Sequence, residues 1–125
     1  MKHSRLLLTL AALGGALAVA CGAFGAHALR ASFDAGQLAL WQTAVSYLFW
    51  HVLAALFAAR YAETTEARGG AIAAMLFLAG STVFSLTLFG LALGAPRWFG
   101  AITPLGGTAL IAGWLVLGWT VWRRR

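Results

Sequence analysis

Two histidines and two serines are the residues of this sequence that could do chemistry within otherwise apolar stretches. His27 ends the run CGAFGAHALR, and His51 lies in QTAVSYLFWHVLAAL. Ser81 and Ser85 are separated by one helical turn. A histidine can activate a serine nucleophile, but that chemistry also needs an acid to orient the ring. The only acidic residues lie in the polar connecting segments, so the sequence predicts a protein that is not an enzyme.

A metal or haem site shared by the two histidines is disfavoured by their depths. At a rise of ~1.5 Å per residue, His27 lies ~3 Å from the outer end of the first apolar stretch, whereas His51 lies ~20 Å below the outer end of the second. No carboxylate lies within either stretch to serve as a further ligand. We therefore expect no metal and no cofactor.

The composition indicates which solvent the chain requires. Of its 125 residues, 62% are hydrophobic and only 10% are charged, whereas about a quarter of the residues of a soluble domain carry charge. The formal net charge is +6, but the basic residues lie at the ends of apolar segments and form no stripe for a nucleic acid. We therefore expect the lipid bilayer to be the main partner and no nucleic acid to bind.

Four apolar stretches are close to the ~20 residues that a helix needs to cross ~30 Å of hydrocarbon. None alternates polar and apolar residues as a barrel strand does. The sequence therefore predicts an all-α membrane protein, a bundle of four transmembrane helices in a single domain over residues 1–125. The expected helices are 6–29, 35–59, 71–93 and 104–122.

Basic residues predict the orientation of this bundle. The two termini and the middle loop share one side and carry seven lysines and arginines, whereas the other side carries only Arg30 and Arg97. The positive-inside rule then places both termini in the cytoplasm.

The first stretch also allows a second interpretation, because MKHSRLLLTLAALGGALAVAC could be a lipoprotein signal with Cys21 acylated. Ala18 stands where such signals usually have a larger aliphatic residue. The apolar run also continues to Leu29, beyond the ~7 to 15 residues of a signal core. We therefore expect the stretch to remain as the first helix.

Two connections contain helix-start signals. Asp34 and Gln37 have the spacing of a capping box, which predicts that the second helix begins near Ala35. In ITPLGG, Thr103 is the expected N-cap and Pro104 the expected first helical residue.

Small residues recur every fourth position in the first helix, and a shorter series occurs in the fourth. Such ridges let helix backbones approach closely, either within one bundle or in a homodimer. The expected packing residues are Gly14, Ala18, Gly22, Ala26, Ala109 and Gly113.

A helical wheel divides the second helix into a polar and an apolar half. We expect the polar half to face the bundle interior and to join two serines of the third helix, because ionisable and polar groups in a membrane usually face inward. The apolar half should then face lipid: Leu38, Trp41, Val45, Leu48, Val52 and Leu56. With His27 hydrogen-bonded to Gln42 and Thr43, the candidate interior network is His27, Gln42, Thr43, Ser46, Tyr47, His51, Ser81 and Ser85.

Three segments in this order, GAFGAHAL, QTAVSYLFWHVLAAL and VFSLTLFGLALGAPRWFGAITPLGGTALIAGW, resemble the small membrane-protein family called domain of unknown function 423, which is related to vertebrate transmembrane protein 256. The resemblance implies a multi-pass protein of the bacterial cell (inner) membrane with four helices, and it brings no established activity. Residues matching the family pattern are Gly25, Ala26, His27, Tyr47, His51, Phe84, Ser85, Thr103, Pro104, Gly106, Gly107, Gly113 and Trp114.

This chain departs from the pattern in its second helix. Members often have a basic residue at Ser46, a glutamine at Leu48 and a tyrosine at Trp50, so a mechanism that needs a buried positive charge there is disfavoured. We expect a non-enzymatic scaffold or assembly partner that contacts other membrane proteins or a second copy of itself. The alternative is a small transporter that uses the polar face of the second helix and the membrane histidines.

Overall fold

The computed structural model describes residues 2–124, and all the secondary structure in this part of the chain is helical. The helices are α1 (Lys2–Phe24), α2 (Ala35–Thr65), α3 (Arg68–Ala92) and α4 (Phe99–Arg123), and a π-helical turn, η1 (Gly25–Leu29), extends α1. Each of the four long helices is long and apolar enough to cross a membrane. The prediction of an all-α membrane protein with four spanning helices is confirmed.

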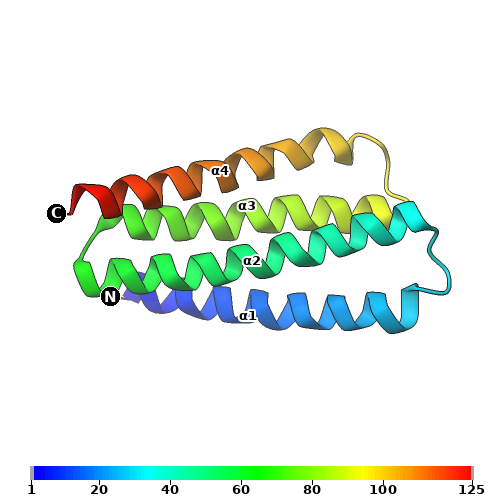
Figure 1. The fold of residues 1–125 in the computed structure, drawn as a ribbon, viewed down its shortest axis with the longest axis horizontal. Helices are drawn as coiled ribbons and strands as arrows, with labels where there is room; N and C mark the ends of the chain where they lie inside the picture. Colours follow the sequence, from blue (N-terminus) through cyan, green and yellow to red (C-terminus); the bar gives the residue numbers. More distant parts are fainter. Residues whose placement is uncertain (1, 125) are drawn as a thin grey trace.

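The helices pack in chain order (Figure 1). α1 lies against α2, α2 against α3, and α3 against α4, whereas α1 makes few contacts with α3. Both termini and the connection between α2 and α3 lie at one end of the molecule, and the other two connections lie at the opposite end. The result is an open bundle in which α1 and α4 form the two edges.

Within residues 2–124, the start of α2 is the one helix start that a side-chain cap defines, and its prediction is confirmed. The Asp34 carboxylate accepts a hydrogen bond from the Gln37 backbone N–H at 2.8 Å, and the Gln37 side-chain oxygen accepts one from the Asp34 N–H at 3.0 Å. The Gln37 side chain also donates to the Ala92 carbonyl at 3.1 Å. Gln37 therefore completes the cap at the start of α2 and links this helix to the last turn of α3.

The start of α4 differs from the prediction. The helix begins at Phe99, so Pro104 lies inside it and Thr103 does not act as its N-cap. Instead the Thr103 hydroxyl is hydrogen-bonded to the Phe99 carbonyl at 3.1 Å and to the Thr87 hydroxyl at 2.7 Å. A proline this close to a helix start removes one backbone hydrogen bond, and the threonine pair fixes the same turn against α3.

Alanines and glycines let α2, α3 and α4 approach closely. Ala55, Ala58 and Ala73 are fully buried where α2 meets α3. Between α3 and α4 the backbones approach closely at Gly80 and Gly106, where a Cβ added to Gly106 would lie 2.8 Å from the Gly80 carbonyl oxygen. In lipid, this close backbone packing replaces the hydrophobic drive that water would supply.

The structure places most of the expected packing residues between helices. Gly14 meets Val52, Gly22 meets Val45, and Ala18 is buried in the same contact between α1 and α2. In α4, Gly113 lies against the Phe77 ring and Ala109 lies beside Gly80.

Ala26 is the exception, because it is exposed and the neighbouring Gly25 is buried instead. A step of four residues advances ~400° around a helix, so a strict series drifts by ~40° per step and leaves the contact surface. A Cβ added to Gly25 would lie 2.5 Å from the Trp41 ring. Gly25 therefore provides the small surface that we expected from Ala26.

The expectation that the apolar half of α2 faces lipid is wrong. Trp41, Leu48 and Val52 are buried, and Val52 is only 1% exposed. These large side chains fill the space over the small residues of α1. Hydropathy alone cannot separate the two environments, because lipid tails are as apolar as leucine.

Candidate functional site

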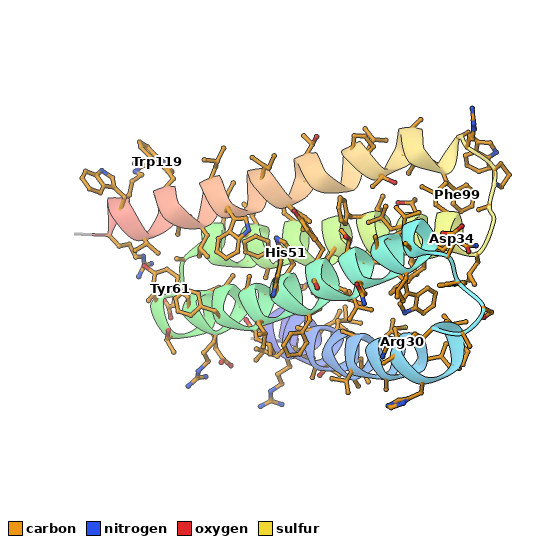
Figure 2. All side chains as sticks on the ribbon, turned by 45° about the vertical axis from the view of Figure 1, so that its right-hand side comes forward. Arg30, Asp34, His51, Tyr61, Phe99 and Trp119 are labelled. Atoms are coloured by element: carbon orange, nitrogen blue, oxygen red, sulfur yellow. The ribbon has the colours of Figure 1, made fainter. Side chains whose placement is uncertain are left out.

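His51 is the buried ionisable group at the centre of the candidate site. It is 6% exposed and lies at mid-length of the molecule, between the end marked by Asp34 and the end marked by Tyr61 (Figure 2). Its Nε2 accepts a hydrogen bond from the Trp114 indole N–H at 3.1 Å, and its Nδ1 lies 2.7 Å from the Tyr47 carbonyl oxygen. This arrangement requires the neutral ring with its proton on Nδ1.

The positions of the residues on the helices explain how the His51–Trp114 pair forms. Tyr47 and His51 are one turn apart on α2, so the ring nitrogen reaches the carbonyl of the preceding turn. Trp114 comes from α4, and the Phe77 ring of α3 packs against both His51 and Trp114 with ring centroids 5.9 and 4.8 Å away. The His51–Trp114 bond therefore joins α2 to α4 across the surface of α3.

A groove opens beside this pair, and we call it the α2/α4 groove. α3 provides its floor with Phe84, and α2 and α4 provide its walls. Its volume is about 560 Å³. Its lining residues are Tyr47, Trp50, His51, Phe84, Gly107, Leu110, Ile111 and Trp114.

The two serines of the expected network are buried in α3, but neither reaches His51. The Ser85 hydroxyl donates to the Ala44 carbonyl of α2 at 2.7 Å, and the Ser81 hydroxyl donates to the Leu78 carbonyl of its own helix at 3.4 Å. Ser85 therefore acts as a hydrogen-bonded link between α2 and α3. Within residues 2–124 no serine–histidine pair is formed.

Three polar residues of α2 that we expected inside the bundle lie elsewhere. Gln42 and Thr43 are exposed and Ser46 is half-buried, on the outer side of the helix. His27 is exposed as well and forms no hydrogen bond with either Gln42 or Thr43 within residues 2–124. The contacts of α2 with α1 and α3 cover its other side, so these residues are left outside the fold.

A second groove lies on this outer side, between α2 and the turn η1. It has a volume of about 350 Å³, and it is lined by Gln42 and Ser46 together with small residues of α1 and η1 such as Gly22 and Ala26. We call it the α1/α2 groove. Trp41 forms its base and donates its indole N–H to the Cys21 carbonyl at 2.8 Å.

The hydrogen bonds of Trp41, Trp114 and the Thr87–Thr103 pair were not predicted, because the sequence indicated that Trp41 faces lipid and that Thr103 caps the fourth helix. The two tryptophans had one available signal, since a buried indole N–H nearly always finds an acceptor. That rule does not identify the acceptor, which depends on how the helices cross. No group of three or more His, Cys, Asp or Glu side chains within residues 2–124 is arranged to hold a metal ion.

Comparisons with known proteins agree with this membrane architecture. The family model described as "Protein of unknown function (DUF423)" matches residues 21–107. A UPF0382 membrane protein of Staphylococcus saprophyticus, SSP2132, is 39% identical over 90% of this chain and 93% of its own length. The UPF0382 membrane protein YwdK of Bacillus subtilis is 36% identical over 90% of this chain and 93% of its own length.

The UPF0382 inner membrane protein YgdD of Escherichia coli K12 is 34% identical over 91% of this chain and 87% of its own length. No solved structure matches the chain. The relatives and the four candidate spans together make this a multi-pass protein of the bacterial cell (inner) membrane. The chain belongs to the DUF423 family of membrane proteins, for which no activity is named.

Proposed function

We propose that the protein is a non-enzymatic assembly partner that binds another membrane helix through the outer side of α2. The observation that carries this proposal is the position of Gln42. Its side chain is exposed and forms no hydrogen bond within residues 2–124. It lies about 10 Å along the helix axis from the first residue of α2, which places its backbone within the span.

An amide without a partner is costly at this position. Lipid offers it no hydrogen bond, and an unpaired polar group in hydrocarbon costs several kcal/mol. Thr43 and Ser46 lie beside it, but their short hydroxyls can bond back to a carbonyl of their own helix. A partner that hydrogen-bonds to the Gln42 carboxamide removes this cost, so the carboxamide provides the drive for association.

The neighbouring surface suits a helix as the partner. The α1/α2 groove runs beside Gln42, and the small residues Gly22 and Ala26 along it permit a close backbone approach. A carboxamide both donates and accepts, so it can pair with polar groups of another membrane protein or with the same residue of a second copy. Hydrogen bonds between membrane helices contribute about 0.6 to 2 kcal/mol each.

The same geometry supports assembly better than transport. A transporter needs its polar face to line a pathway enclosed by helices, whereas Gln42 and Thr43 lie on the outside of α2. His51, the buried histidine, has both ring nitrogens engaged, by Tyr47 and Trp114.

Site-specific photo-crosslinking in native membranes tests the proposal. A photoreactive amino acid replaces Ala39, which is exposed on the same side of α2, and we expect a covalent adduct with a polypeptide. Gln42→Leu should weaken this adduct several-fold, and Gln42→Asn should preserve most of it. The mass of the adduct distinguishes a second copy from another protein.

The control places the same probe at Leu115, which is 69% exposed on α4. There we expect adducts with lipid only. Absence of a polypeptide adduct at position 39, or an adduct that Gln42→Leu leaves unchanged, would contradict the proposal.

A further inference from the structure

The α2/α4 groove lies in the middle of the membrane span. Tyr47, on its α2 wall, is halfway between Asp34 and Arg60, about 20 Å along the helix axis from each of these charged residues. On α4, Trp114 is about 22 Å from Phe99, the first residue of the helix, and about 13 Å from Arg123, and His51 occupies the equivalent level on α2. The groove is therefore out of reach of water and of lipid headgroups.

One polar group in this groove has no hydrogen-bonding partner. The Tyr47 hydroxyl forms no hydrogen bond within the described part of the chain, although its backbone carbonyl and its ring both contact His51. A lipid acyl chain cannot satisfy a hydroxyl. The ester groups that could do so lie ~15 Å away, at the edge of the hydrocarbon. A molecule that satisfies Tyr47 must therefore carry its own polar atoms to mid-membrane depth on an apolar body.

The walls favour a planar ring on that body. Four aromatic side chains, from all three helices of the groove, line it: Tyr47, Trp50, Phe84 and Trp114. Electron-rich aromatic faces stack well on a planar, electron-poor ring. A sterol, by contrast, holds its hydroxyl near the headgroups and presents no flat conjugated ring.

We propose that the α2/α4 groove binds a quinone, a lipid-soluble molecule whose planar ring stacks between the aromatic walls while the Tyr47 hydroxyl donates a hydrogen bond to a ring carbonyl. The His51–Trp114 bond sets the distance between α2 and α4 at the base of the groove. Both residues are positioning groups, because the Trp114 N–H bonds to His51 Nε2 and the other His51 nitrogen bonds to the Tyr47 carbonyl.

The groove has the size that this ligand needs. Its volume of about 560 Å³ falls within the ~300 to 1,000 Å³ of small-molecule sites. On the α4 wall of the groove, Gly107 has no side chain to occupy the space. A Cβ added there would meet the Phe84 ring at ordinary contact distances of 3.7 and 3.8 Å. A larger side chain at this position would thus occupy the groove without forcing the helices apart.

Binding is tested with decylubiquinone and with decylbenzene, which has the same tail and a ring without carbonyls. The melting temperature of the detergent-solubilised protein is measured as each probe is titrated, because a ligand that binds the folded state stabilises it by mass action. We expect saturable stabilisation by decylubiquinone and at least tenfold weaker binding of decylbenzene.

Three variants locate the site. Tyr47→Phe keeps the ring and removes the hydroxyl, so it should weaken decylubiquinone binding about fivefold to tenfold. Gly107→Leu should abolish the binding. The matched control is Gly118→Leu on the same helix, where an added Cβ meets nothing within 4 Å, and it should bind as the wild type does.

Equal binding of the two probes would overturn the requirement for ring carbonyls. Wild-type decylubiquinone affinity in Tyr47→Phe would also overturn the proposal, whether or not Gly107→Leu folds. None of these measurements depends on association through Gln42.

Discussion

His51 and His27 are chemically identical residues in opposite environments. His51 is buried, and both of its ring nitrogens contact hydrogen-bonding groups from α2 and α4. His27 lies on the exposed side of η1. The neutral imidazole suits the first position because it donates with one nitrogen and accepts with the other, which a protonated ring cannot do.

This difference predicts the effect of each histidine on stability. His51→Ala should lower the melting temperature of the solubilised protein, with a loss of about 1 to 3 kcal/mol, because it leaves the Trp114 N–H unpaired and opens a cavity. His27→Ala should stay within about 0.5 kcal/mol of the wild type. The sequence alone favoured a stabilising role for His27, and a large loss in that variant would restore it.

Part of the candidate site could be predicted at the level of single residues. An ionisable ring inside a spanning segment identifies His51 as a candidate without any structure. Its partner could not be identified in the same way, because Trp114 is distant in sequence and reaches His51 only through the crossing of α3 and α4. The prediction that Gln42 faces the bundle interior is wrong, because a helical wheel separates polar from apolar residues without showing which neighbouring helices cover them.

At the level of helices, the crossing of α3 and α4 depends on backbone contact at Gly106. A Cβ added there would lie 2.6 Å from the Phe84 backbone nitrogen and 2.8 Å from the Gly80 carbonyl oxygen. Backbone atoms cannot move aside as a side chain can. The two helices would therefore have to separate, and the hydrogen bond between Thr87 and Thr103 beside the crossing would lengthen.

Gly106→Ala should destabilise the protein by about 1 to 3 kcal/mol, as overpacking does in other close contacts. The matched control is Gly118→Ala, where no atom lies within 4 Å of an added Cβ. That variant should be unchanged or more stable by up to about 1 kcal/mol, because alanine favours helix over glycine. Thermal unfolding of both variants in one detergent measures the difference, and equal stabilities would contradict the role given to Gly106.

The helices themselves were largely predictable, because length and hydropathy define a membrane span. The neighbours that each helix face contacts were not predictable. Trp41 and Val52 pack onto α1 although they belong to the apolar half of α2. The small residues of α1 indicated where a helix contact would form but not which helix would make it.

At the level of the whole molecule, the helix ends and connections divide between two opposite ends of the bundle. The start of α1, the α2–α3 connection and the end of α4 lie at one end of the molecule (Figure 1). Most lysines and arginines fall at this end. The positive-inside rule therefore predicts that both termini are cytoplasmic.

Reporter fusions test this orientation. A reporter that is active only in the cytoplasm should be active when fused after Arg125. It should be inactive when fused after Arg97, in the connection between α3 and α4. The opposite pattern in expressed fusions would reverse the topology and would place the basic end outside.

The open bundle has a consequence for how the protein is made. Each helix packs mainly against the one that precedes or follows it in the chain, so the order of synthesis is also the order of assembly. α2 can close over α1 as soon as both are inserted, and α3 can add to that hairpin without displacing a contact already formed. The hydrogen bond between Trp114 and His51 joins α2 to α4, two helices that are not consecutive, and it forms last, when α4 emerges and completes the fold.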